Sequence, residues 1–197
     1  MSVHIMILTI LIISSPVVAV CLAYFWIRYR LRRATTGDYD VIGNGCWRTN
    51  RRGEGSKEAL RIHRARIAKH AGFGMNRDEA IYWGADVDSN DNQITHNHRY
   101  RIEGSDPDTR WWCISVNRDG FFIPNKFDRY SFSKTDVKRE TNGSWVIKLS
   151  TEEQPGNWIP LGDKKGNFRI TLRCYNPKPS MIEKSETTNL PHLIRED

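Results

Sequence analysis

Apolar side chains alternate with other residues on both sides of an Asp-Gly pair near the centre of the sequence, between residues 110 and 133. In an extended strand this spacing places Trp112, Ile114 and Val116 on one face. Asp119-Gly120 supplies the residues that tolerate the positive φ angles of a tight turn, and Phe121 begins a second apolar run. The pattern predicts a β-hairpin at the centre of a sheet, with Trp112 in the core.

The same period of two recurs along much of the chain after residue 78. Turn residues separate its apolar segments, which are 81–87, 100–102, 145–149 and 168–174. Short strands at such intervals predict a mainly β fold, a jelly-roll-like antiparallel β-sandwich, over residues 56–176. We expect one helix, from Ser56 to about Ala71, to pack on it. Residues 177–197 contain three prolines and no sustained period, which predicts a surface tail.

The N-terminal residues 5–27 contain no charged side chain, and a helix of about 20 apolar residues spans a bilayer. Four arginines follow, at positions 28, 30, 32 and 33. We predict a single transmembrane helix within residues 1–33, with membrane lipid as the partner of residues 5–27. The alternative is a cleaved signal peptide, but the run is long for one and no Lys or Arg precedes it. The basic flank favours a cytoplasmic position for the rest of the chain.

Residues 34–55 are rich in Gly, Asn, Thr and Arg and show little periodicity. This composition predicts an extended linker between the membrane helix and the domain. Cys46 and Trp47 interrupt it, and a Trp in a polar segment usually packs against a folded surface. We therefore expect Trp47 to fix the linker to the domain.

The formal charge of +7 is concentrated near the N-terminus, because seven arginines precede residue 55. The remaining Lys and Arg number 23, against 20 Asp and Glu. The folded part is close to neutral, which argues against nucleic acid as a partner.

The four cysteines are scattered without the paired spacing of a zinc site. Cys113 and Cys174 both fall in predicted strands, so a disulfide between them across a sheet remains open.

Two short polar motifs resemble metal ligands. A strand would point His96 and His98 the same way, but no third ligand stands at a motif spacing. Asp86, Asp88 and Asn90 begin like a calcium loop, yet Asp91 occupies the position that needs Gly. We favour hydrogen-bonded histidines and a plain hairpin turn, and we expect no metal and no cofactor.

Several longer motifs resemble one family. They are EAIYWGADVDSNDNQI at residues 79–94, YRIEG at 100–104, RWWCISVNRDGFFIPN at 110–125, DRYSFS at 128–133, PGNWIPLGDKKGNFRITLRCYNP at 155–177 and LPHLIRE at 190–196. Together they resemble the domain of unknown function 1214 family, from about Trp47 to Glu196. The resemblance implies a jelly-roll-like β fold and, in short members, an N-terminal membrane segment with the domain outside the cytoplasm. It supplies no catalytic residues, and Cys113 and Asn117 depart from the expected Ser or Thr and Tyr.

One set of aromatic and polar residues is a candidate ligand site at the mouth of such a jelly roll. Its members are Tyr82, Trp112, Arg129, Tyr130, Asn157 and Trp158. The alternative is that the rings are core and that Arg129 and Asn157 satisfy backbone groups at strand ends.

The sequence contains no local signature of nucleophilic, phosphate-binding or dinucleotide chemistry. We expect a membrane-anchored, non-enzymatic binding or envelope-associated module, with its domain on the extracytoplasmic side as the resemblance implies. The alternative is a hydrolytic or metal-assisted enzyme with its site at the mouth of the jelly roll.

Overall fold

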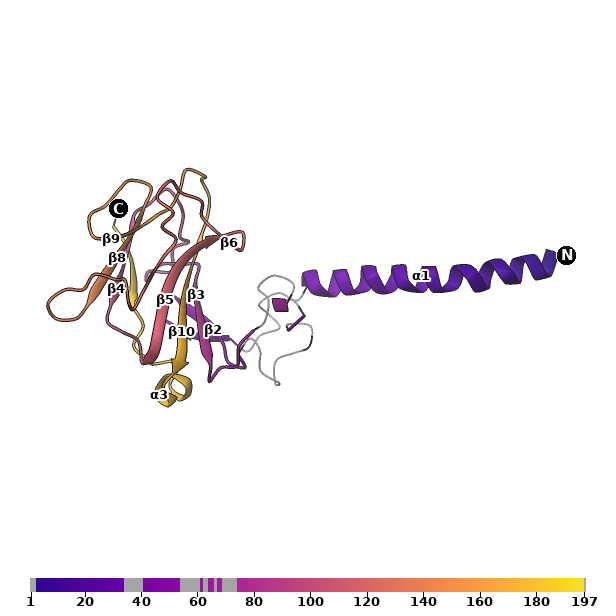
Figure 1. Cartoon of the computed structure of the whole chain (residues 1–197), viewed down its shortest axis with the longest axis horizontal. Helices are drawn as coiled ribbons and strands as arrows, with labels where there is room; N and C mark the ends of the chain where they lie inside the picture. The colour runs from indigo at the N-terminus through magenta and orange to yellow at the C-terminus, as the bar shows by residue number, and fades with distance from the viewer. Residues whose placement is uncertain are drawn as a thin grey trace.

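The computed structural model describes residues 3–33, 41–53, 61, 64, 65, 67, 68 and 74–196. Two β-sheets form the framework of the described chain after residue 40 (Figure 1). The predicted mainly β class is confirmed.

The larger sheet has the order β1-β2-β3-β10-β5-β6, and β7 also pairs with β5. Its strands are β1 (Val41–Asn44), β2 (Trp47–Asn50), β3 (Ala80–Ala85), β5 (Thr109–Arg118), β6 (Phe121–Phe122), β7 (Ser131–Ser133) and β10 (Arg169–Pro177). The hairpin predicted around residues 119 and 120 joins β5 to β6, and both turn residues have positive φ, 54° at Asp119 and 85° at Gly120. β10 lies between β3 and β5, so the last long strand completes the centre of the sheet.

The smaller sheet has the order β11-β4-β8-β9. Its strands are β4 (Tyr100–Gly104), β8 (Trp145–Ser150), β9 (Asn157–Pro160) and β11 (His192–Arg195). β8 and β9 run parallel, whereas the other strand pairs that the structure describes are antiparallel. The predicted all-antiparallel arrangement is therefore wrong at this edge, where residues 151–156 return the chain to run alongside β8.

The two sheets share one hydrophobic core. Trp112 from the larger sheet packs on Trp145 from the smaller one, with ring centroids 4.7 Å apart, and both side chains are fully buried. Ile114 and Leu172 come from the same inward face of the larger sheet, as the alternation in the sequence requires. The prediction that Trp112 faces the core is confirmed.

The segment predicted as a linker over residues 34–55 contributes the β1–β2 hairpin to the larger sheet. Trp47 is 2% exposed, and its Nε1 donates a hydrogen bond to the carbonyl of Pro191 at 2.7 Å. Trp47 does pack on the domain, as expected. The linker boundary is wrong, because the domain begins at β1 instead of at residue 56.

The predicted surface tail over residues 177–197 is also part of the domain. It forms the short helix α3 (Pro179–Glu183) and the strand β11, which pairs along its length with β4. Met181 and Leu193 are fully buried in the shared core. Pro177 ends β10, Pro179 begins α3 and Pro191 precedes β11, so the prolines mark the boundaries of elements and not a loose tail.

The helix predicted from Ser56 to Ala71 lies mostly outside the described residues. Only residues 61, 64, 65, 67 and 68 of that segment are described, and they are helical.

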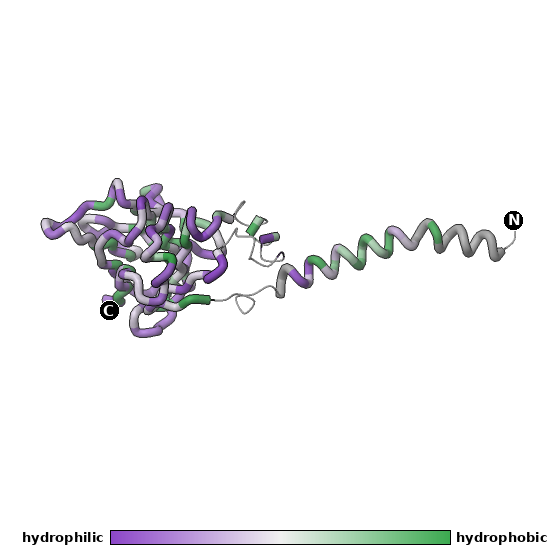
Figure 2. The backbone as a smooth tube through the Cα atoms, turned by 90° about the horizontal axis from the view of Figure 1, so that it is seen from below, coloured by the Kyte–Doolittle hydropathy of each residue, from purple (hydrophilic) through white to green (hydrophobic). Residues whose placement is uncertain are grey.

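The N-terminal helix α1 (Val3–Arg33) extends away from the two sheets in Figure 1, and Figure 2 shows apolar residues recurring along it. Among the described residues, no helix is long and apolar enough to cross a membrane. This finding does not confirm the transmembrane helix predicted over residues 5–27.

Cys113 and Cys174 are free thiols. Cys174 pairs with Trp112 and points into the core, whereas Cys113 pairs with Arg173 and lies on the outer face. The two cysteines are offset by one residue in the β5–β10 pairing, so their side chains point to opposite faces of the sheet. A disulfide between them is therefore ruled out in this fold.

Candidate binding site

A cleft of about 480 Å³ opens between the β1–β2 hairpin and the segment that includes α3. Its lining comes from four places along the chain: Ile42, Arg51, Arg77 and residues 182–187. Ile42 lies in β1, Arg51 follows β2 directly, and Arg77 lies in the turn before β3. The cleft therefore forms only when the two ends of the domain come together.

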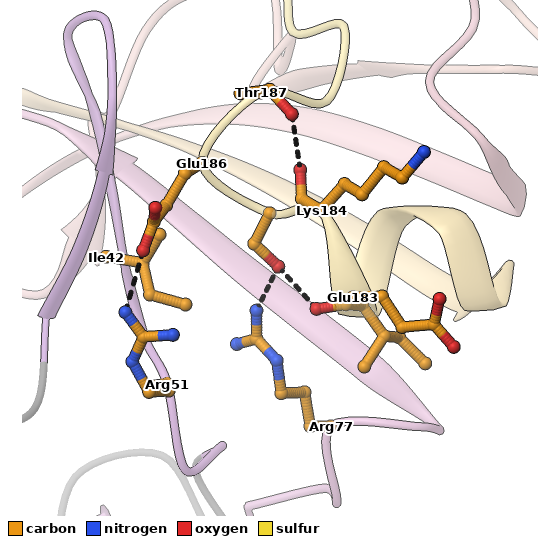
Figure 3. Close-up of a pocket in the computed structure, with 9 residues that line it drawn as sticks. Ile42, Arg51, Arg77, Glu183, Lys184, Glu186 and Thr187 are labelled. Carbon is orange, nitrogen blue, oxygen red and sulfur yellow. Dashed lines mark hydrogen bonds and ion pairs between the residues drawn. The ribbon is translucent and has the colours of Figure 1, made fainter.

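Arg77 reaches across the cleft from the side opposite α3 (Figure 3). Its Nη1 donates to the carbonyl of Asn50 at 2.6 Å, and its Nη2 donates to Ser185 Oγ at 2.5 Å. Ser185 is 3% exposed, and its hydroxyl in turn donates to the carbonyl of Met181 at 2.7 Å. The guanidinium is thus held in place by two oxygens that carry no formal charge.

The electrostatic surroundings of Arg77 are unfavourable for a cation. Burial lowers the pKa of the Arg77 guanidinium below its usual value, and the positive charge of Arg51 lowers it further. In the part of the chain that the structure describes, no carboxylate pairs with Arg77. Because an arginine keeps its proton at physiological pH, the site holds a partly desolvated positive charge.

Arg51 lies beside Arg77 and pairs with Glu186, with Nη2 and Oε1 2.7 Å apart (Figure 3). Both side chains are more than half exposed, at 51% and 62%. An ion pair this exposed contributes at most about 1 kcal/mol, so another anion can replace Glu186 at little cost. Figure 3 also shows Glu183 and Lys184 pointing away from the two guanidiniums.

The cleft brings two guanidiniums together with the carboxylates of Glu183 and Glu186. Two neighbouring guanidiniums present planar sets of N–H donors, the geometry that matches carboxylate and phosphate oxygens. Ile42 and Ile182 add apolar surface beside them. The described lining residues include neither His nor Cys, so its chemistry consists of charge, hydrogen bonding and apolar contact.

A family model described as "protein of unknown function (DUF1214)" matches residues 79–179, just over half of the chain. The chain belongs to this family. The match begins at the residue before β3 and ends at the first residue of α3, so it covers the centre of both sheets. The β1–β2 hairpin and β11 lie outside the matched residues.

Two solved structures are similar to this member of the DUF1214 family. The VPA0106 protein from Vibrio parahaemolyticus is 22% identical, with a TM-score of 0.57, over 71% of this chain and 36% of that one. An uncharacterized protein from Burkholderia cenocepacia is 16% identical, with a TM-score of 0.40, over 62% of this chain and 31% of that one. This chain spans about a third of their length, and the first likeness supports the fold alone. The comparison with curated proteins gave no match.

The six residues predicted to form a ligand site do not line the cleft. Trp112 is core, and its Nε1 donates to Asp106 Oδ1 at 2.9 Å. The amide of Asn157 is fully used, since it bonds both the N–H and the carbonyl of Lys138 and the carbonyl of Val146. For Asn157 the structure matches the alternative, in which the amide satisfies backbone groups.

The other four predicted residues are spread over two regions. Tyr82 lies half-buried on the outer face of the larger sheet, beside Arg173. Arg129 pairs with Asp136 at 3.1 Å instead of with backbone groups.

Tyr130 and Trp158 each adjoin an exposed phenylalanine. Tyr130 stacks on Phe122 at 5.5 Å, and Trp158 meets Phe127 edge-on at 4.9 Å. Their predicted role in ligand binding stays a prediction.

The two histidines considered as metal ligands have separate partners. His96 Nε2 lies 2.7 Å from the carbonyl of Gly162, and His98 Nδ1 lies 2.8 Å from Arg195 Nη2. Among the described residues, no three His, Cys, Asp or Glu side chains are grouped to hold a metal ion.

The acidic turn at residues 86–91 is explained by its own hydrogen bonds. Asp88 is 1% exposed, and its Oδ1 accepts from the backbone N–H groups of Asn90 and Asn92 at 2.8 and 3.0 Å. Asp91 adopts φ 61°, and Val87 bridges Gln93 across the turn. The carboxylate therefore organises the turn, as the plain hairpin interpretation predicts.

Sequence reasoning missed the cleft, because its residues are ordinary surface types spread between positions 42 and 187. Arg51 was assigned to the linker and Ser185 to the tail. Trp47 is the one feature of the sequence that points toward the cleft, because its expected packing implies that residues 34–55 fold onto the domain.

Proposed function

We propose that this protein is a membrane-attached, non-enzymatic binding module that holds a small carboxylate or phosphate in the cleft between β1–β2 and α3. The observation that carries the proposal is the half-buried Arg77, whose guanidinium contacts only uncharged oxygens in the described structure and stands beside Arg51. The jelly-roll connectivity expected from the family resemblance is part of the same proposal.

An anion in the cleft would offset the main electrostatic cost of the site. Hydrogen bonds between a guanidinium and an oxyanion are about twice as strong as neutral ones. Arg77 is already fixed by Asn50 and Ser185, so little side-chain freedom is lost when a ligand binds. The exposed ion pair between Arg51 and Glu186 can give way to one between Arg51 and the ligand.

The test is a thermal-shift titration of the full chain in detergent micelles with inorganic phosphate and with succinate. We expect each to raise the melting temperature of the native chain in a saturable way, and to do so much less in Arg77→Gln. Arg110→Gln is the matched control, because Arg110 is exposed on β5 and does not line the cleft. Phosphate also stabilises proteins by exclusion from their surfaces. Equal shifts in the native chain and Arg77→Gln would therefore remove the proposal.

The membrane part of the proposal concerns α1. Its described large apolar side chains are about half to two-thirds exposed, and they are Ile12, Val17, Val18, Val20, Leu22, Tyr24, Phe25, Trp26, Ile27 and Tyr29. An apolar surface of this extent requires a cover. A bilayer supplies one, and Tyr24, Trp26 and Arg28 are typical of its interface. We expect the full chain to float with vesicles after a carbonate wash, and its release by the wash would contradict membrane insertion.

We propose the extracytoplasmic side for the β domain, on the family resemblance and against the bias of the arginines after residue 27. Thr141→Cys provides an exposed thiol in a turn for a bulky, membrane-impermeant maleimide. We expect the maleimide to label Thr141→Cys in intact cells and not to label the chain without this substitution. Labelling only after lysis would place the domain in the cytoplasm.

A further inference from the structure

We propose that a second surface of the domain, the aromatic tip formed by Phe121, Phe122 and Phe127, inserts into the boundary between headgroups and acyl chains of the bilayer. These are the exposed large apolar side chains of the described domain apart from Val41, at 78%, 51% and 43%. The inference rests on the membrane attachment proposed above.

The shape of the tip favours a bilayer over a flat protein partner. Phe121 and Phe122 are the two residues of β6, directly after the turn at Gly120. Consecutive residues of a strand point to opposite faces, yet both rings are exposed. The hairpin end therefore presents apolar surface on both sides, which suits immersion in an apolar layer better than packing against one surface.

Contacts with other aromatic rings of the domain hold Phe122 and Phe127 in place. Phe122 stacks on Tyr130 with an interplanar angle of 27°, and Phe127 meets the ring of Trp158 edge-on. Trp158 is in turn fixed by a hydrogen bond from Nε1 to Ser150 Oγ at 2.9 Å. Phe122 and Phe127 therefore lose little side-chain entropy when the tip inserts.

Three basic residues lie near the aromatic tip, together with the acidic Asp119 and Asp128. Lys126 Nζ lies 4.9 Å from the centre of the Phe127 ring. Lys164 pairs with Asp119 in the turn at 3.5 Å, and Arg118 bonds the carbonyl of Asn167. Exposed aromatic rings next to Lys and Arg match an anionic lipid interface, where the rings enter and the cations meet phosphate headgroups.

The length of the connection keeps the domain near the membrane. α1 ends at Arg33 and β1 begins at Val41, and eight Cα steps span at most about 30 Å. A domain held this close samples contacts between the aromatic tip and the bilayer at high effective concentration.

Photo-crosslinking of the full chain in vesicles tests the inference. p-Benzoylphenylalanine replaces Phe121 in one variant and Thr141, in another exposed turn, in the control. The vesicles contain equal parts of phosphatidylcholine and phosphatidylglycerol. We expect several-fold more lipid adduct at position 121 than at position 141, with both variants melting like the native chain.

The outcomes separate this inference from the membrane proposal. In one outcome both variants float with the vesicles while position 121 gives no lipid adduct, or no more than position 141. That result overturns the insertion of the aromatic tip and leaves the membrane proposal standing. Crosslinking of position 121 to a second copy of the chain also overturns it, in favour of self-association. Failure of the full chain to float overturns membrane attachment and the inference together.

Discussion

Trp112 and Trp111 are neighbours in sequence with different structural roles. Trp112 is fully buried, packs on Trp145 and donates its Nε1 to Asp106. Trp111 lies half-buried on the outer face, against Tyr175. We expect Trp112→Ala to lower the free energy of unfolding by about 3–5 kcal/mol, as for a large aromatic removed from a core. Trp111→Ala should lower the free energy of unfolding clearly less in the same denaturant titration. Equal losses for the two variants would contradict the assignment of Trp112 to the core and Trp111 to the outer face.

Asp106 gives a second prediction at the residue scale. Burial opposes its ionisation, but hydrogen bonds from Trp112 and Arg139 outweigh burial and hold the pKa of Asp106 below its usual value. A depressed pKa contributes stability above the unfolded value, about 3.9, that is lost as pH falls through the folded value. We therefore expect Asp106→Asn to be less stable than the native chain near pH 6, with the difference shrinking below about pH 4.

Melting temperatures measured between pH 6 and pH 3 check this expectation. Asp119→Asn is the control, because its partner Lys164 and Asp119 itself are both largely exposed, at 76% and 77%. A deficit of Asp106→Asn that stays constant down to pH 3 would show that its charge adds no stability.

Among the elements, β11 is one that the sequence pattern does not predict. Leu193 is fully buried in the core, whereas its neighbour Ile194 is half-buried and points the other way. We expect Leu193→Ala to cost about 2–5 kcal/mol in denaturant unfolding and Ile194→Ala to cost much less. A denaturation midpoint of Leu193→Ala equal to that of the native chain would mean that β11 is not part of the core, as the sequence-based prediction of a surface tail holds.

The elements predicted from sequence are those with long periodic runs. β3, β5, β8 and β10 contain three or more alternating apolar residues, and in each strand these residues face the core. β1, β2 and β11 have four residues each, β1 contains a glycine and a proline precedes β11, so no period develops. Their place in the fold is decided by tertiary contacts such as Trp47 to Pro191, which a local pattern cannot encode.

For the whole molecule, the architecture was more predictable than the candidate site. Burial of alternating apolar side chains decides the two sheets, and that signal is local in sequence. The cleft depends on bringing Arg51 and Arg77 next to Ser185, across more than a hundred residues. Arginine and serine are common on surfaces, so only the fold distinguishes Arg77 from an ordinary solvated side chain.

The most direct measurement follows the Nε–Hε signals of Arg77 and Arg51 by NMR while inorganic phosphate is added to the full chain in micelles. Lysine substitution at each position assigns the two signals. An anion bound in the cleft predicts that both move together and saturate at one phosphate concentration, and that Arg77→Gln abolishes the saturable movement of Arg51. If the two signals stay fixed, or move linearly with ionic strength like those of exposed arginines, the cleft is not an anion site.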